Sequence, residues 1–480
     1  MIRKELRALA PTWLAIVAGM VAAEFGPQLL RGFAPLCYFI GAVALGAQAI
    51  GHEFSHRTWQ LLLLQPVRRE RLLLAKLGVL AALLGSLAVA AAFSLTFNRG
   101  EQAFKGALLT LPAALGFFVA PWLSMAARSP LAGTVFPVAL AGIAFVTANW
   151  LGVRLYGYTR EVDAFRTAFM WWTMGGLCAT GAVMTWWTFL RLQVTDGSSA
   201  DLGIRRRAVP AGSAGSTFTK RNRTWVLLTK ELHLQQLALA VAGVYTAGYV
   251  LLVVAVAESS RDLGESIGVV ATFYGGVLAM LVGALASAEE RQIGTHEWQQ
   301  LMPMAAWQQW AVKAGTAIGL AFVLGIGLPF LLLWVLPPEQ AAWPRRIWPM
   351  RQPVALILIA IVTTGSLYVS SVTRSGMWAL TLSVPVMLGA AMFFGWVSRP
   401  IENAVYQAGL LGAARLSLPS LSGNGVFLMV FAALLGMVLW FGLANQRSSD
   451  RSVSRISQQV VWMAAWTVVG LTAVLVLGAI

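Results

Sequence analysis

The sequence predicts an all-α protein that crosses the membrane many times, with two parallel six-helix repeats and a thirteenth C-terminal helix. Of the 480 residues, 58% are hydrophobic and only 11% are charged, whereas soluble domains carry about 25% charged residues. Apolar runs of about 20 residues recur along the chain, and this length crosses a hydrocarbon core of about 30 Å as a helix. A polar pattern that occurs twice divides the chain into halves.

The apolar runs define the candidate spans. Six lie in the first half, at 11–30, 33–51, 74–95, 107–127, 130–150 and 169–190. Six more lie in the second half, at 236–257, 266–287, 314–336, 353–373, 376–395 and 422–444. Transmembrane strands would be shorter and would alternate with period two, which these runs do not. The last run, 458–480, follows a basic loop and has no partner in the first half, so a helix lying on the membrane surface is the alternative there.

The charge of the chain fits a membrane location. Its net charge of +16 is typical of the excess of Lys and Arg in cytoplasmic loops and of attraction to anionic lipids, so nucleic acid is not an expected partner. With the N-terminus placed inside, most basic residues fall on the cytoplasmic side. We therefore expect a multi-pass protein of the cytoplasmic (inner) membrane of a bacterium, with a cytoplasmic N-terminus.

Polar and helix-breaking residues recur in one register. Two series lie 237 residues apart: Glu53, Thr58, Pro66 and Lys76, then Glu290, Thr295, Pro303 and Lys313. Two further matches are Lys4-Glu5 with Lys230-Glu231, and Arg128-Ser129 with Arg374-Ser375. General similarity among membrane helices would match Leu and Ala instead, so the pattern predicts an internal repeat. Because each half has an even number of spans, both halves should run in the same direction.

This organisation predicts four regions. The first transmembrane half covers 1–190 and the second covers 224–445. Between them, 191–223 is rich in Gly, Ser and Arg, which is typical of a flexible basic linker on the cytoplasmic side. Residues 446–480 comprise a basic loop and the extra helix.

Residues 52–56 spell H-E-x-x-H, the signature of zinc proteases, in which two histidines bind the metal and the glutamate acts as base. A catalytic zinc also needs a third protein ligand. The repeat keeps the glutamate as Glu290 but has Glu289 and Ile293 in place of the histidines. We therefore expect no metal, and an intramembrane zinc metalloprotease remains as a minor alternative.

The second copy of the pattern resembles the segment between spans two and three of ABC type-2 transporter permeases. Its matching residues are Glu290, Gly294, Thr295, Pro303 and Lys313. The first copy matches at Glu53, Thr58, Pro66, Arg68, Arg69 and Lys76, with Arg57 where the family usually has Gly. The resemblance implies that 52–76 and 289–313 contain coupling helices, which insert into a groove of an ATP-binding subunit. A simple stop-transfer loop held by its arginines is the alternative.

The same resemblance extends to two other places. Lys4-Glu5 and Lys230-Glu231 resemble the amphipathic helix that precedes the first span in this family. Arg128 and Arg374 resemble its cytoplasmic turn between spans four and five.

The resemblance also implies the partners. The sequence contains no G-x-x-x-x-G-K-[ST] phosphate loop, so the chain itself is not expected to be an enzyme or to bind a cofactor. ATP and Mg would be bound by two copies of a separate ABC ATP-binding subunit. The apolar spans favour export of a hydrophobic or amphipathic substrate. A secondary transporter with twelve to thirteen spans is the alternative, although it would usually carry charged residues in mid-membrane.

Overall fold

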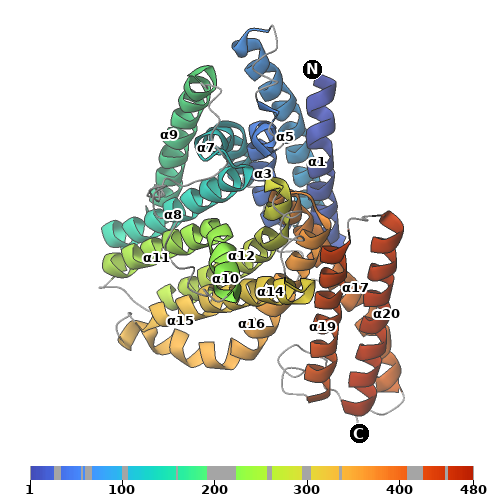
Figure 1. Ribbon diagram of the computed structural model, residues 1–480. Helices are drawn as coiled ribbons and strands as arrows, with labels where there is room; N and C mark the ends of the chain where they lie inside the picture. The colour runs from blue at the N-terminus through green and yellow to red at the C-terminus, as the bar shows by residue number, and fades with distance from the viewer. Residues whose placement is uncertain are drawn as a thin grey trace, which may run out of the picture. The chain divides into compact units, whose positions relative to one another are not determined.

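The computed structural model describes residues 2–25, 34–55, 58–59, 67–99, 106–157, 161–191, 223–256, 262–294, 304–334, 338–407, 425–448 and 452–478. These residues are almost all helical, with no strand among them (Figure 1). The linker around 192–222 and the central parts of both predicted coupling segments, with Pro66, Thr295 and Pro303, lie outside the described residues.

Within the described residues, every predicted span lies on a helix. The first half contains α1 (Ile2–Phe25), α3 (Ala34–Ser55), α5 (Arg69–Arg99), α6 (Gly106–Ala114), η2 (Leu115–Val119), α7 (Ala120–Ala126), α8 (Pro130–Tyr156) and α9 (Glu161–Arg191). The second half contains α10 (Arg223–Leu234), α11 (Gln236–Val256), α12 (Asp262–Ile293), α14 (Ala306–Phe322), η3 (Val323–Gly327), α15 (Leu328–Leu333), α16 (Pro338–Val372), α17 (Gly376–Gln407) and α19 (Gly425–Arg447). The C-terminal run forms α20 (Val453–Gly478).

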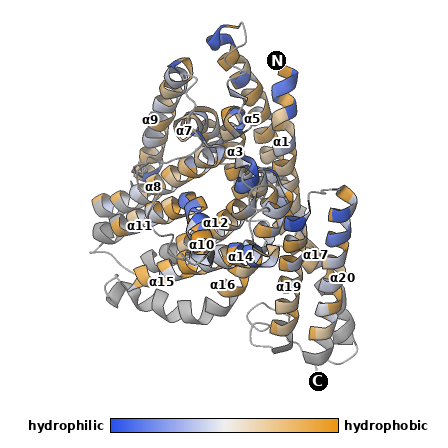
Figure 2. Ribbon diagram, in the orientation of Figure 1, coloured by the Kyte–Doolittle hydropathy of each residue, from blue (hydrophilic) through white to orange (hydrophobic). Residues whose placement is uncertain are grey.

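Nine helical stretches in the described part of the chain are long and apolar enough to cross a membrane. They lie on α1, α3, α5, α6 to α7, α12, α14 to α15, α16, α17 and α19. The chain is therefore a multi-pass α-helical membrane protein. Spanning by α8, α9, α11 and α20 stays a prediction. Figure 2 shows that α20 begins with a hydrophilic turn and continues as a hydrophobic helix.

The helices group into two compact units. The first comprises Met1–Leu14 and Tyr38–Leu237, and the second comprises Ala15–Cys37 and Ala238–Ile480. This grouping differs from the predicted halves in two places. The stretch 15–37 groups with the second unit, and α10 groups with the first.

Two helices contain a single wide turn of π-helix just before a proline. Residues Leu115–Val119 precede Pro121, and Val323–Gly327 precede Pro329. A proline lacks the N–H that would bond to the fourth residue before it, and its ring collides with that residue's carbonyl. The wide turn removes this collision and lets each helix continue across the membrane.

In each unit, two helices pack closely at a glycine, and the two glycines occupy equivalent positions of the repeated pattern. A Cβ on Gly46 of α3 would collide with the backbone of Gly116, and a Cβ on Gly283 of α12 would lie 2.6 Å from the carbonyl oxygen of Thr363. Small residues allow this close packing of membrane helices, which gains dispersion contacts where lipid provides no hydrophobic driving force. Gly46 and Gly283 are 237 residues apart, as are the two polar series.

In the second unit, α19 and α20 form an antiparallel pair. At one end, Asn445 Nδ2 donates to Gln459 Oε1 at 3.2 Å and Gln459 Nε2 donates to Asn445 Oδ1 at 2.9 Å. At the other end, Gly470 lies against Val430, and Val474 packs in a cluster with Phe431. The thirteenth helix therefore packs along α19 over most of its length.

Candidate functional site

Three helices of the first unit converge on a buried lysine. Lys76 Nζ of α5 donates to Glu5 Oε1 of α1 at 2.8 Å and to Glu53 Oε1 of α3 at 3.1 Å. Lys4 Nζ lies 3.6 Å from the same Glu53 oxygen. Lys76 and Glu53 are completely buried and Glu5 nearly so, whereas the Lys4 side chain is 56% exposed. We call Lys4, Glu5, Glu53, Thr58 and Lys76 the first cluster.

The first cluster also fixes the chain where it leaves α3. The Thr58 hydroxyl donates to Glu53 Oε2, and the Thr58 backbone N–H donates to the Glu53 carbonyl at 3.1 Å. Glu53 therefore binds Thr58, within the predicted coupling segment, while it neutralises Lys76. The same carboxylate would serve as base in a zinc-protease mechanism, but it is occupied by these contacts.

Trp59, next to Thr58, anchors the same stretch in the apolar interior. Its ring stacks on Phe54 at a centroid distance of 5.0 Å and meets the edge of Phe189 at 5.6 Å. The other buried residues packed around Trp59 come from α3, α5, α7 and α9: Ile50, Leu72, Leu73, Met125 and Phe189. The start of the segment is thus packed against the ends of four helices.

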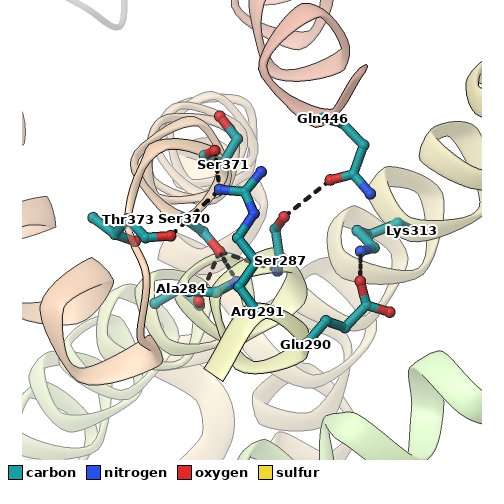
Figure 3. A network of polar contacts seen from close by, with 10 residues as sticks. Ala284, Ser287, Glu290, Arg291, Lys313, Ser370, Ser371, Thr373 and Gln446 are labelled. Atoms are coloured by element: carbon teal, nitrogen blue, oxygen red, sulfur yellow. Dashed lines mark hydrogen bonds and ion pairs between the residues drawn. The ribbon is translucent and has the colours of Figure 1, made fainter. Parts of the chain in front are cut away.

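The second unit has an equivalent buried ion pair. Lys313 Nζ of α14 donates to Glu290 Oε2 of α12, and both side chains are completely buried (Figure 3). The partners are 23 residues apart in sequence, as are Lys76 and Glu53. We call Glu290 and Lys313 the second cluster.

The helix that carries Glu290 ends at Gly294. This glycine has φ +80°, and its N–H donates to the Arg291 carbonyl at 3.3 Å. Residues with a side chain are disfavoured at positive φ, which explains why glycine occupies this helix C-terminus.

Arg291 ties the same end of α12 to the end of α16. Its guanidinium donates to the carbonyls of Ser371 and of Thr373, the latter at 3.3 Å (Figure 3). The last carbonyls of a helix lack partners within the helix and carry negative partial charge, so a cation there is favourable.

Further polar contacts hold α12 to α16 and α19. Ser370 Oγ donates to the Ala284 carbonyl at 2.8 Å and accepts the N–H of Ser287, while Ser287 Oγ donates to Gln446 at 3.1 Å. In the first unit, Ser124 Oγ donates to the Ala47 carbonyl at 3.1 Å. Ser124 and Ser370 keep the same spacing as Arg128 and Arg374, so the repeat register could have identified both serines in advance.

The two predicted turns are helix N-caps. Arg128 (φ +49°) precedes Ser129, whose Oγ accepts the N–H of Ala132 at 3.5 Å at the start of α8. Arg374 precedes Ser375, whose Oγ accepts the N–H of Trp378 at 3.3 Å at the start of α17. Serine is favoured at this position because its side chain satisfies an N–H that has no partner within the helix.

The predicted amphipathic helices differ between the halves. Lys230 and Glu231 lie on α10, which is separated from α11 at Gln235. Lys4 and Glu5 instead lie in the first turn of α1, which continues to Phe25 with Pro11 inside it. The first half therefore has no separate helix here, and Glu5 is held by Lys76 in the first cluster.

Several predicted residues remain apart from either cluster. Arg68 and Arg69 are exposed at the start of α5, and Arg69 Nη1 donates to the Leu190 carbonyl at 2.7 Å. His56 lies outside the described residues, and His52 is partly buried on α3. Among the described residues there is no group of three or more His, Cys, Asp or Glu that could hold a metal ion.

Sequence reasoning missed Trp59, Arg291 and the amide pair Asn445–Gln459. Of these, only Trp59 could have been predicted from the sequence, because an aromatic residue beside Thr58 at a helix end is typical of a side chain that packs into the interior. Comparison of the chain with models of protein families, with curated proteins and with solved structures finds no match.

Proposed function

We propose that the chain is the transmembrane permease subunit of an ABC transporter, with both six-span halves in one polypeptide. It exports a hydrophobic or amphipathic substrate across the cytoplasmic membrane of a bacterium. Separate ATP-binding subunits supply the energy, and they dock on the segments 52–76 and 289–313. The chain has no ATPase site of its own.

One observation carries this proposal: a buried ion pair closes each predicted coupling segment. Glu53 and Lys76 stand at the two ends of the first segment, and Glu290 and Lys313 stand at the two ends of the second. Each pair joins the helix that enters the segment to the helix that leaves it. A movement of the segment would therefore be transmitted to both helices together. Coupling of ATP hydrolysis in a docked subunit to a transport path in the membrane requires such a transmission.

The first segment has a second connection. Thr58 is bonded to Glu53, and Trp59 packs against residues of α3, α5 and α9. In our mechanism, ATP closes the paired ATP-binding subunits and displaces the segments. The helix ends fixed to them then tilt and open a path between the two halves.

The proposal is tested by co-expressing the chain with the ABC ATP-binding subunits of its own host and purifying any complex. We expect two ATP-binding subunits per chain and ATPase activity that orthovanadate inhibits, with none for the chain alone. A chain that binds no ABC ATP-binding subunit from its own host would refute the proposal. Transport driven by an ion gradient without ATP would instead favour a secondary transporter.

Trp59 allows a test of coupling separate from docking. We expect Trp59→Ala to retain both ATP-binding subunits and their ATP hydrolysis while substrate-dependent stimulation of hydrolysis is lost. Removing a buried Trp costs about 3–5 kcal/mol, so Trp59→Phe serves as a milder variant with partial stimulation. Trp172→Ala, on an 82% exposed side chain of α9, is the matched control and should behave as wild type. Full stimulation in both Trp59 variants would exclude this residue from coupling.

A further inference from the structure

The start of α5 presents a basic surface. Its exposed residues are Val67, Arg68, Arg69, Glu70 and Arg71, so the exposed charges here are three arginines and one glutamate. The hydrogen bond from Arg69 to the Leu190 carbonyl fixes one of them against the end of α9. This surface lies within the second part of the first predicted coupling segment, 52–76, and we call it the first docking end.

The corresponding surface of the second unit is uncharged. In the repeat register, positions 67–71 correspond to 304–308, which read Met304, Ala305, Ala306, Trp307 and Gln308. Trp307 is 55% exposed and Gln308 is also exposed. The backbone here is well fixed, because Gln309 Nε2 donates to the Met304 carbonyl at 3.1 Å and the Gln308 N–H donates to the Ala305 carbonyl at 2.9 Å. We call this the second docking end.

The arginines occur at the first docking end only. This difference favours a contact with a protein partner over a contact with lipid headgroups. Lys and Arg near a membrane surface commonly contact anionic lipid headgroups. If α5 needed them for that reason, α14 would need them too, since it begins at the equivalent point of the repeat. Instead, the first basic residue of α14 is Lys313, which is buried in the second cluster. Different contacts with a protein partner at the two ends account for the difference.

We propose that the two ends bind their ATP-binding subunits by different chemistry. The first docking end recognises an acidic surface through Arg68 and Arg71. The second docking end inserts Trp307 into an apolar pocket. This inference rests on the proposed function and specifies the partner surface at each of its two docking points. Charge pairs at the rim of an interface are screened by salt, whereas burial of an aromatic side chain is not. Binding at the first docking end should therefore weaken as ionic strength rises, and binding at the second should not.

The experiment measures how many ATP-binding subunits bind to the full-length chain in nanodiscs, at low and high salt. The double variant Arg68→Glu/Arg71→Glu should lose one subunit, and the remaining subunit should bind independently of salt. Trp307→Ala should also lose one subunit, but the remaining one should bind about 10-fold more weakly at high salt, since two exposed ion pairs contribute about that factor. Arg7→Glu, an exposed basic residue of α1, and Trp225→Ala, a 56% exposed side chain of α10, are the matched controls.

Three results would overturn the inference. Equal salt dependence of the remaining subunit in both variants would mean that the ends use the same chemistry. Two bound subunits in both variants would mean that neither surface docks a partner. A loss in phosphatidylglycerol nanodiscs that disappears in phosphatidylcholine would assign the arginines to lipid. If wild type binds no ATP-binding subunit at all, the proposed function itself fails, which is a distinguishable outcome.

Discussion

Lys76 and Lys313 are lysines with completely buried side chains, each bound to a glutamate 23 residues earlier in the chain. Removing an ammonium group from water costs several kcal/mol, and the cost is offset only where a carboxylate and further hydrogen bonds are close. The first cluster supplies two carboxylates and the Ala49 carbonyl at 3.5 Å. These residues therefore act inside the protein, and a coupling role for them would be exerted through the helices that they join.

Lys76→Met should lower the free energy of unfolding by about 3–5 kcal/mol, because it leaves Glu5 buried without its ion-pair partner. Glu53→Gln should cost less, since Lys76 keeps its contact with Glu5. Unfolding in detergent micelles, followed by circular dichroism, measures both. Asp163→Asn, which breaks an ion pair of an 85% exposed carboxylate with Arg166, should cost less than about 1 kcal/mol. The explanation fails if Lys76→Met is no more destabilising than this control.

At the scale of elements, the two halves share two local features. A Glu–Lys pair joins α3 to α5 in the first half and α12 to α14 in the second, and a serine caps the N-terminus of α8 and of α17. In the first half, Thr58 bonds to Glu53 where the chain leaves α3. In the second half, α12 is followed by Gly294, which has positive φ.

The Gly294 conformation can be tested by substitution. Gly294→Ala should destabilise the protein by about 1–2 kcal/mol, since a Cβ at φ +80° approaches the following carbonyl. No atom of the described residues lies within 4 Å of the new methyl group, so the expected effect comes from the backbone. Gly315→Ala on α14 is the matched control, because it also meets nothing within 4 Å but lies within a helix. It should stabilise by up to about 1 kcal/mol. Equal effects at both sites, measured by thermal unfolding, would contradict a strained Gly294.

At the scale of the molecule, α20 is held to the second unit by buried polar groups. Gln459 pairs with Asn445 of α19 and accepts from the Tyr368 hydroxyl of α16 at 2.9 Å. Asn445 also donates to Ser371 Oγ at 3.2 Å. Satisfied amide pairs of this kind fix one register of packing between helices that are otherwise apolar. Because α20 follows α19 antiparallel over most of its length, a spanning α19 makes a spanning α20 the expected arrangement.

This arrangement predicts that the C-terminus and the turn before α20 lie on opposite sides of the membrane. The native thiols Cys37 and Cys178 are first replaced by Ala. One variant then carries Ser452→Cys and another carries a cysteine in a C-terminal tag. A membrane-impermeant maleimide should label one of them in intact spheroplasts and the other only after permeabilisation. Labelling of both from the same side would mean that α20 lies on the membrane surface.

The sequence by itself determined the membrane class, the segments that form the long apolar helices and the spacing of the repeated polar residues. These follow from composition, from runs long enough to cross a bilayer, and from residue types such as Pro, Ser and Gly that act locally. Such properties depend on neighbours in the chain, so no tertiary contact is needed to read them.

Only the tertiary structure decided what the repeated charges do. Glu53 and Lys76, or Glu290 and Lys313, are 23 residues apart, and no local rule says that they meet, or that they are buried instead of facing a partner. The insertion of Trp59 among four helix ends and the attachment of α20 through Gln459 are likewise contacts between distant parts of the chain. Burial is a property of the packed molecule, because the desolvation that makes a charge costly arises only when other helices exclude water from it.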